Sequence, residues 1–509
     1  MDYRTMIGQR LAIGFPGEKL SSETIALIRE YKIGNLVIFR NNVENNEQFR
    51  KLCDDIQDLV LEVTGYPAFI CIDQEGGMVS RLSPDAVVVP ENMAAAAAGG
   101  PDIAYQLACI TARQLRGIGP NLNFAPVVDV NSNSKNPVIG VRSFGDDPLS
   151  VAEYSAAAVR GYLDSGVMCC AKHFPGHGDT VVDSHVGLPV INKSLPELQK
   201  TELIPFRSVI EAGVPAIMSS HILFPQLEPD RVPATMSRRI MHDLLRDEMG
   251  FDGLVFSDDM WMEAIRNHYG LSRRTVCAVK AGNDVICCRE DLQRQRNMAD
   301  ALLQAVEHGD ISKNELEFSF ERILSAKEKF AFTHPEPELA GRREDFAYAK
   351  QITASAVVRF SGVFQSLSED PFFCGPKDYR TTLAVDADPY ITDFVTYMRE
   401  RFSAAGIICG IDPSSEEIAG IATEAKKHKS IVLGTCNAHQ FRGQLALAGA
   451  LAETGLPMTV IALRNPYDLR EIPESVCKAA VFDYTLNGLS AAAEFLVSGK
   501  APGHLPVRL

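Results

Sequence analysis

Short apolar runs recur along the first part of the chain, and longer stretches with helical spacing of apolar residues separate most of them. The runs are rich in Val, Ile, Phe and Cys and too short for helices, which is typical of strands buried in a parallel sheet. Residues 47–63 and 102–118 are examples of the helical stretches. The predicted strands are residues 11–15, 35–39, 68–73, 123–130, 167–174, 216–222, 253–259 and 283–288.

This alternation predicts about eight β/α units in sequence. Such a series favours an α/β fold with a (β/α)8 barrel of the TIM type, which occupies about 250 residues and more with insertions. A doubly wound open sheet gives a similar local pattern and stays an alternative.

The alternation stops after a predicted helix that ends near residue 332 and resumes further along the chain. Residues 333–345 contain two prolines and mixed charges, which marks a linker. The second part contains neither GxGxxG nor GxxxxGKS/T, so we assign it no nucleotide. Its predicted strands, typical of a smaller doubly wound α/β sandwich domain, are residues 381–387, 406–412, 430–435, 458–465 and 479–484. We predict a catalytic barrel domain over residues 1–335, a linker over 336–350 and a C-terminal α/β domain over 351–509.

Composition and charge limit the classes of partner. Hydrophobic residues make up 46% and charged residues 23% of the 509 residues, which is typical of a folded protein with a sizeable core. The net charge of −15 argues against binding nucleic acid or an anionic membrane through bulk charge, so we expect neither partner. The 12 cysteines form no CxxC, and we recognise no secretory signal or membrane-spanning run, so we expect a cytoplasmic protein with reduced thiols.

Charged and imidazole side chains stand where several predicted strands end. In a barrel these positions face one another around the same rim, so the sequence predicts one polar site there. Taken singly, each residue also has a structural interpretation, such as a helix cap, a surface ion pair or a hydrogen-bonded packing residue. The set comprises Asp73, Arg81, Asp129, Arg142, Lys172, His173, His221, Asp258 and Asp259.

Residues 171–189, AKHFPGHGDTVVDSHVGLP, contain three of the chain's 11 histidines and two aspartates. A metal site is one interpretation, although a proline and two glycines disfavour a helix that would put His173 and His177 on one face. An acid/base site fits better, because Asp183 stands two residues before His185 and can fix the tautomer of its imidazole. With Asp258 as a nucleophile this set would cleave glycosides, although the usual version uses two carboxylates.

Four motifs carry a resemblance to a known family. They are DQEGGMVSRL (residues 73–82), NPVIGVRSFG (136–145), KHFPGHGDTVVDSH (172–185) and FSDDMWMEAI (256–265). In this order they resemble the β-N-acetylhexosaminidase branch of glycoside hydrolase family 3, in its two-domain form.

The resemblance implies a retaining exo-β-N-acetylglucosaminidase that removes terminal non-reducing N-acetylglucosamine through a covalent glycosyl-enzyme. It makes Asp258 the nucleophile, His185 the acid/base residue and Asp183 the carboxylate that orients His185. It implies no metal and no cofactor. The expected substrates are carbohydrate fragments derived from peptidoglycan or chitin, and a cytoplasmic location would favour peptidoglycan recycling. The positions that align with sugar-binding residues are Asp73, Arg81, Arg142, Lys172 and His173.

The chain departs from the family pattern at Met78, where the family often has arginine, and we expect an effect on the pocket edge only. Trp261, the only tryptophan, either lines the sugar site or has a packing role. The second domain, with GKAPGHLPV at residues 499–507, resembles the family's C-terminal domain and is expected to carry no catalytic residue. The alternatives are a β-N-acetylglucosaminide phosphorylase, a β-glucosidase of the same family, substrate-assisted hydrolysis with Asp258 and Asp259, and a sugar-binding protein without catalysis. The sequence indicates no oligomeric state.

Overall fold

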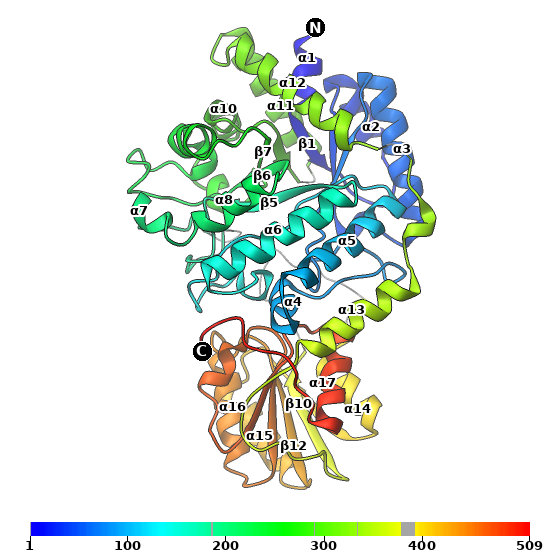
Figure 1. Cartoon of the computed structure of the whole chain (residues 1–509), viewed down its shortest axis with the longest axis vertical. Helices are drawn as coiled ribbons and strands as arrows, with labels where there is room; N and C mark the ends of the chain where they lie inside the picture. Colours follow the sequence, from blue (N-terminus) through cyan, green and yellow to red (C-terminus); the bar gives the residue numbers. More distant parts are fainter. Residues whose placement is uncertain (1, 185–186, 290, 333, 378–391) are drawn as a thin grey trace.

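The protein is described by a computed structural model that covers residues 2–184, 187–289, 291–332, 334–377 and 392–509 (Figure 1). Two α/β domains follow one another along the long axis of the molecule, with the N-terminus at the outer end of the first (Figure 1). The described part of the chain contains no helix that is long and apolar enough to cross a membrane.

Within the described residues, the first domain is built on eight parallel strands in the order β7-β6-β5-β4-β3-β2-β1-β8. A bridge between Phe256 and Val285 joins the two outer strands, and the Ser257 amide donates to the Val285 carbonyl at 2.9 Å. The sheet therefore closes into a barrel, which confirms the predicted barrel over the open sheet. The strands are β1 (Leu11–Gly14), β2 (Asn35–Ile38), β3 (Phe69–Ile72), β4 (Leu122–Asn123), β5 (Met168–Phe174), β6 (Ala216–Ser219), β7 (Leu254–Ser257) and β8 (Ile286–Cys288).

Each predicted strand of the barrel overlaps an observed one, but β4 is shorter than predicted. The apolar pattern predicts a strand over residues 123–130, whereas regular pairing ends at Asn123. Pro126 has no amide hydrogen to donate to a neighbouring strand, and an isolated bridge from Val127 to Lys172 continues the pairing. The chain therefore leaves the sheet early and forms a long loop on the rim of the barrel.

Helices cover the outside of the barrel, and their sequences explain where they begin and end. The side chains of Ser21, Asn45 and Asp147 each accept a hydrogen bond from the amide three residues on, which caps the following helix. Gly65 ends one of these helices in the left-handed conformation, with φ of 78°. The main helices that follow the eight strands in turn are α2 (Ser22–Tyr31), α3 (Asn46–Thr64), α5 (Pro101–Ile118), α6 (Pro148–Asp164), α8 (Leu203–Glu211), η4 (Arg239–Glu248), α10 (Leu271–Ala281) and α11 (Leu292–Glu307). The remaining elements of this domain are α1 (Tyr3–Gln9), η1 (Arg40–Asn42), α4 (Asn92–Ala98), η2 (Gly140–Arg142), α7 (Leu195–Leu198), η3 (Ala234–Met236), α9 (Glu263–Arg266) and α12 (Lys313–Phe330).

The interior of the barrel is a packed core. Phe69 and Cys71 of β3 belong to the interior cluster, whereas the isoleucines between and after them pack on the helix side, as strand alternation requires. Phe124 and Phe256 meet edge to face in the interior, with ring centres 5.5 Å apart. Space for a ligand is therefore expected above this core, at the carboxyl ends of the strands.

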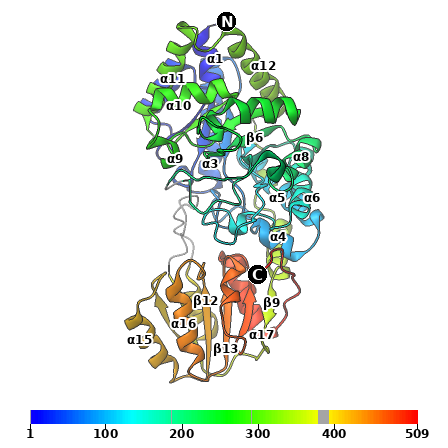
Figure 2. The same ribbon diagram turned by 90° about the vertical axis from the view of Figure 1, so that its left-hand side faces the viewer.

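In the described residues the second domain contains a six-stranded sheet in the order β11-β10-β12-β13-β14-β9. Neighbouring strands are parallel, except that β9 runs antiparallel to β14. Helices α15 and α16 pack together on one face of the sheet and α14 packs with α17 on the other (Figures 1 and 2), which confirms the predicted α/β sandwich. The strands are β9 (Val358–Ser361), β10 (Pro371–Pro376), β11 (Ala405–Cys409), β12 (Ser430–Thr435), β13 (Met458–Ala462) and β14 (Cys477–Ala480). The helices are α14 (Phe394–Phe402), α15 (Ser415–Ala425), α16 (Arg442–Ala452), η6 (Pro466–Arg470) and α17 (Leu486–Ser498).

The strands of the second domain were predicted less completely than those of the barrel. The predicted strands over residues 406–412, 430–435, 458–465 and 479–484 correspond to β11 to β14. The predicted strand over residues 381–387 lies outside the described residues. The sequence analysis missed β9 and β10, because β9 is short and half-exposed and β10 begins and ends with a proline, a residue that usually marks turns.

The segment between the two sheets is largely helical. Residues 336–350, predicted as a linker, contain η5 (Pro337–Leu339) and the first half of α13 (Arg343–Ser355). Asp345 of α13 accepts a hydrogen bond from Arg113 Nε of α5 at 3.1 Å, so α13 is held against the barrel. The boundaries at 1–335, 336–350 and 351–509 stay a prediction.

Candidate active site

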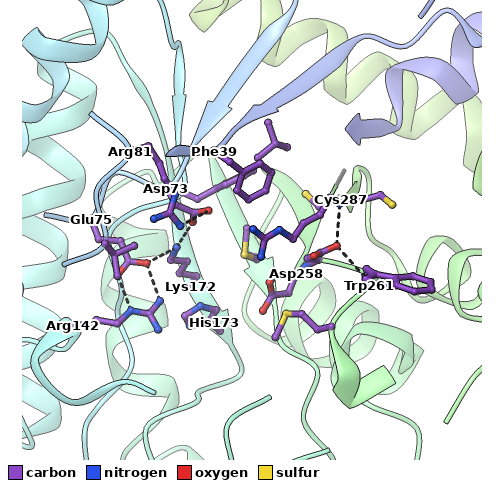
Figure 3. A pocket seen from close by; sticks show the side chains of 18 of the residues that line it. Phe39, Asp73, Glu75, Arg81, Arg142, Lys172, His173, Asp258, Trp261 and Cys287 are labelled. Carbon is purple, nitrogen blue, oxygen red and sulfur yellow. Dashed lines mark hydrogen bonds and ion pairs between the residues drawn. The ribbon is translucent and has the colours of Figure 1, made fainter. Parts of the chain in front are cut away.

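A cavity of about 280 Å³ opens at the carboxyl ends of the barrel strands. Its charged side chains lie on two opposite sides (Figure 3). We call the side formed after β3, β4 and β5 the clamp wall, and it contains Asp73, Glu75, Arg81, Arg142, Lys172 and His173. We call the side formed after β7 and β8 the aspartate wall, and it contains Asp258, Asp259, Trp261, Met262, Glu263, Arg266, Cys287, Cys288 and Arg289.

The clamp wall is a connected set of buried ion pairs (Figure 3). Lys172 Nζ lies 2.7 Å from Asp73 Oδ1 and 2.6 Å from Glu75 Oε1. Arg142 donates from Nε and Nη2 to the two oxygens of Glu75, each at 2.8 Å. Arg81 Nη2 is 3.9 Å from Asp73 Oδ2. The paired charges hold one another in fixed positions before any ligand binds.

The pairing also fixes the protonation states of this wall. Burial alone would raise the pKa of Glu75, but Arg142 and Lys172 outweigh it and hold that pKa well below its usual range. Burial would lower the pKa of Lys172, but Asp73 and Glu75 reverse the effect and raise it. Glu75 and Lys172 therefore stay charged at neutral pH.

Lys172 and His173 are consecutive in β5 and yet both line the cavity. In a regular strand, neighbouring side chains point to opposite faces. The pairing of β5 with β6 shifts its register between Lys172 and Phe174, which interrupts the alternation. This irregularity turns both side chains toward the same site.

His173 is oriented by a buried carboxylate. His173 Nδ1 donates to Asp129 Oδ2 at 2.7 Å, and Asp129 Oδ1 accepts the His177 amide at 2.6 Å. Burial would raise the pKa of Asp129, but His173 and His177 lower it. The hydrogen bond fixes the ring of His173 and leaves its Nε2 for a ligand.

His177 has a structural role in the loop that follows β5. Its Nδ1 lies 2.9 Å from Thr180 Oγ1 and its Nε2 lies 3.0 Å from Ser184 Oγ. Burial and the neighbouring His173 lower its pKa to about 4, so its ring is neutral at physiological pH. Both ring nitrogens are engaged, so the geometry does not support His177 as a metal ligand.

On the aspartate wall, two adjacent carboxylates have different surroundings. Asp258 follows β7, and its Oδ1 accepts the Asp259 amide at 2.8 Å. Asp259 Oδ1 accepts the amides of Trp261 at 3.0 Å and Arg289 at 3.2 Å. Burial raises the pKa of Asp259 to about 6, against the effect of these amides and the Arg289 charge. Asp259 thus ties the chain after β7 to the chain after β8.

His221 supports this wall from behind rather than lining the cavity. It is fully buried at the end of β6, and its Nε2 donates to the Asp259 carbonyl at 3.0 Å. Its Nδ1 lies 2.8 Å from Thr235 Oγ1. The packing interpretation of His221 therefore fits the structure.

Trp261 both lines the cavity and packs against cations. The guanidinium carbons of Arg266, Arg274 and Arg294 lie 5.2, 5.1 and 3.4 Å from its ring centre. Such contacts are attractive because the face of the indole ring is electron-rich. Trp261 thus has both of the roles that the sequence suggested, because it lines the site and also packs against neighbouring side chains.

The segment with Asp183 and His185 is described only in part. Asp183 does not line the cavity, and its carbonyl accepts the Gly187 amide at 3.0 Å. The Ser184 carbonyl accepts the Ala264 amide at 3.2 Å, which places this segment beside α9 on the aspartate wall. His185 lies outside the described residues.

Seven residues predicted from strand ends and motifs line the same cavity, namely Asp73, Arg81, Arg142, Lys172, His173, Asp258 and Asp259. The sequence analysis missed Glu75, although it stands in the quoted DQEGG motif, because its ion pairs with Arg142 and Lys172 have no local sign in the sequence. It also missed the role of Asp129, whose hydrogen-bond partners His173 and His177 lie in β5 and in the loop that follows it. Met78 does not line the cavity, contrary to the expectation for the pocket edge, and is buried in a hydrophobic cluster with residues of the second domain.

In the described residues, a cluster with the spacing of a metal site occurs at His242, Asp243 and Asp247. These residues lie on the exposed side of η4 and not in the cavity. Exposed acidic groups of this kind are common without a metal, and we assign no function to them.

Comparisons with known proteins place this site in a family context. The family model described as "Glycosyl hydrolase family 3 N terminal domain" matches residues 4–326. Beta-hexosaminidase A from Pseudoalteromonas piscicida is 35% identical over 362 residues, which are 64% of this chain and 60% of that protein. The chain thus aligns with less than two thirds of the length of this relative. Beta-hexosaminidase from Thiobacillus denitrificans is 30% identical over 375 residues, which are 72% of this chain and 98% of that protein.

A solved structure resembles the chain over its whole length. It is a glycoside hydrolase family 3 beta-N-acetylglucosaminidase from Paenibacillus sp. str. FPU-7, with 35% sequence identity and a TM-score of 0.93. The match covers 100% of this chain and 99% of the other.

Proposed function

Because this chain belongs to glycosyl hydrolase family 3, we propose that it is a retaining exo-β-N-acetylglucosaminidase that removes terminal non-reducing N-acetylglucosamine. One observation carries the proposal. The cavity presents the carboxylate of Asp258 opposite a buried wall of paired charges that can hold a sugar. The names of the relatives, two β-hexosaminidases and a β-N-acetylglucosaminidase, support the same substrate class.

The proposed reaction has two steps. Asp258 attacks the anomeric carbon and the glycosidic bond breaks, while His185, held by Asp183, gives a proton to the leaving oxygen. In the second step His185 takes a proton from water, whose oxygen attacks the anomeric carbon and releases Asp258. Asp259 is the weaker candidate for the nucleophile, because one of its oxygens already accepts two backbone amides.

The clamp wall provides the side chains that bind the sugar in this reaction. Lys172, Arg81 and Arg142 offer charged donors, and Asp73 offers an acceptor for hydroxyl groups. Paired charges of this kind position a polar ring with little rearrangement, which places its anomeric carbon near the nucleophile. A cavity of about 280 Å³ suits one sugar ring better than a longer segment, which supports action at a chain end.

Fragments derived from peptidoglycan or chitin are the proposed substrates, and a cytoplasmic location with a place in peptidoglycan recycling is the proposed setting. All 12 cysteines are free and all but Cys277 are buried, which supports a reducing compartment. No nucleic acid, membrane or cofactor is part of the proposal.

The test compares hydrolysis of an aryl β-N-acetylglucosaminide with the matching aryl β-glucoside. We expect a strong preference for the acetamido sugar, and a rate that falls about 100-fold or more in His185→Ala. His242→Ala, on the exposed side of η4, is the matched control and is expected to retain full activity. Preference for the glucoside, or a rate independent of His185, would overturn the proposal.

The same assay distinguishes hydrolysis from phosphorolysis. We expect free N-acetylglucosamine as the product in phosphate and in phosphate-free buffer. Formation of the sugar 1-phosphate in phosphate buffer would assign the chain to the phosphorylase alternative instead.

A further inference from the structure

The loop that carries Arg142 is held from the second domain as well as from the barrel. Asn131, at the start of this loop, donates from Nδ2 to the hydroxyl of Tyr467 in η6 at 2.7 Å. Its Oδ1 accepts the Gly140 amide at 3.2 Å, and Gly140 begins the η2 turn that ends in Arg142. Asn131 and Tyr467 are only 2% and 4% exposed, so this link is shielded from water.

The η2 turn also packs closely against the second domain. Gly140 has a φ of 49°, and a Cβ atom there would lie 2.3 Å from Asn465 Oδ1. Further along the loop, a Cβ atom on Gly145 would lie 2.4 Å from the Pro506 carbonyl oxygen. Glycines at these two positions let the backbone of the loop touch the second domain directly.

Apolar side chains reinforce the contact. Val141, the neighbour of Arg142, is fully buried and belongs to the same hydrophobic cluster as Val460 and Leu463 of the second domain. Met78 and Val79 belong to this cluster too, and they stand between Glu75 and Arg81 in the chain. Two of the three segments that supply the clamp wall thus place side chains in the hydrophobic core of the second domain.

A weaker contact links the second domain, through Asn136, to the loop after β5. Gln440 Nε2 donates to the Asn136 carbonyl at 3.3 Å. The side chain of Asn136 accepts the amides of Val138 and Ile139 and donates to the His177 carbonyl at 2.8 Å. Asn136 therefore joins the loop of Arg142 to the segment that leads toward Asp183.

We propose that the second domain is a positioning element of the sugar site, and that Tyr467 is a positioning residue that acts through Arg142. Tyr467 fixes Asn131, Asn131 fixes the start of the η2 turn, and the turn sets the guanidinium of Arg142 against Glu75. No described residue of the second domain lines the cavity, and this domain nevertheless determines how tightly the clamp wall holds a sugar. This inference rests on the proposed function, which places the sugar on that wall.

The test replaces Tyr467 with phenylalanine, which deletes the hydroxyl and keeps the ring. With an aryl β-N-acetylglucosaminide we expect KM to rise about fivefold, as the loss of one buried hydrogen bond allows, and kcat to stay within about twofold. The control is Tyr31→Phe, because Tyr31 is equally buried and its hydroxyl donates to Asp300 Oδ1 at 2.9 Å, away from the cavity. We expect the control to leave KM unchanged.

A double-mutant cycle separates positioning from general destabilisation. In an Arg142→Lys background, Tyr467→Phe should change KM by less than about twofold, because the residue through which it acts is already altered. A fivefold rise in KM in both backgrounds would contradict action through Arg142. An unchanged KM in Tyr467→Phe, with active wild-type enzyme, would overturn the inference and leave the proposed function intact. Wild-type protein without activity on the acetamido sugar would overturn the proposed function itself.

Discussion

The two walls of the cavity contain similar residue types but differ in how their charges are compensated. On the clamp wall, Glu75 is surrounded by Arg142 and Lys172, and its pKa is held well below the usual range. On the aspartate wall, Asp259 is half-buried with fewer cations around it, and its pKa is raised to about 6. Desolvation raises the pKa of both carboxyl groups, and the number of neighbouring cations decides the sign of the net shift.

This difference separates two tasks. A wall whose charges already satisfy one another can bind a neutral sugar without changing protonation state during the reaction. On the opposite wall, Asp258 is the carboxylate proposed to form and break the covalent bond. The contrast predicts that substitutions on the two walls affect different kinetic constants.

The largest effect is expected from removing the proposed nucleophile. Asp258→Asn keeps the shape of the side chain and removes its charge, so kcat should fall at least about 10³-fold, while the affinity for N-acetylglucosamine stays within about threefold. Steady-state kinetics and calorimetric binding measure the two quantities. A variant with near wild-type kcat would place the nucleophile elsewhere.

A substitution that removes the ion pairs of the clamp wall should mainly weaken substrate binding and lower the stability of the protein. Glu75→Gln leaves Arg142 and Lys172 without a shared counter-charge, and breaking a buried pair costs about 3 kcal/mol. We expect KM to rise about 100-fold if that free energy is lost from binding, together with a lower unfolding temperature. Glu62→Gln is the control, since Glu62 pairs with Arg29 at 2.7 Å on the surface and its loss should change neither quantity. Equal effects of the two variants would contradict the account of the clamp wall.

A smaller effect is expected next to the proposed nucleophile. Asp259→Asn retains the oxygen that accepts the amides of Trp261 and Arg289, so the connection between the ends of β7 and β8 is preserved. We expect kcat to fall less than about tenfold, far less than in Asp258→Asn. If the two variants were equally inactive, the adjacent carboxylates would act together, as substrate-assisted hydrolysis requires.

The last prediction concerns stability and not catalysis, at a carboxyl group that supports the clamp wall from outside the cavity. Burial raises the pKa of Glu91 from 4.5 to about 8, although its side chain accepts the Met78 amide. Between these pH values the folded protein keeps a proton that the unfolded chain has lost, so stability falls as pH rises, by up to about 1.4 kcal/mol per pH unit. Glu91→Gln cannot titrate and still accepts the amide.

Thermal unfolding as a function of pH measures this effect. The unfolding temperature of Glu91→Gln should depend less on pH than that of the wild type between about pH 5 and 8, and the variant should be the more stable one near pH 8. Identical slopes for the two proteins would show that Glu91 is not protonated in the folded state.

The fold of the barrel could be predicted because its strands are buried on both faces. Residues 68–72, for example, are apolar throughout, and Asp73, which follows them, marks the rim. The second domain was harder to predict, because β10 lies between prolines and β9 is exposed on one edge. Neither strand has a local pattern that distinguishes it from a loop.

The candidate site could be predicted where a residue stands at a strand end, as Asp73, Lys172 and Asp258 do. Glu75 could not be found in this way, because its function depends on Arg142, 67 residues away in the chain. The contact of Tyr467 with Asn131 spans 336 residues and two domains, and no local pattern encodes it. Pairings of this kind become visible only when the chain is folded.

The most direct test of the two-wall account is to trap the glycosyl-enzyme with a fluorosugar analogue of N-acetylglucosamine and to map the label by mass spectrometry. The account predicts one sugar per chain, attached to the peptide that contains Asp258, and no label in Asp258→Asn. A label on Asp259 or on a residue of the clamp wall, or full turnover without any covalent intermediate, would contradict it.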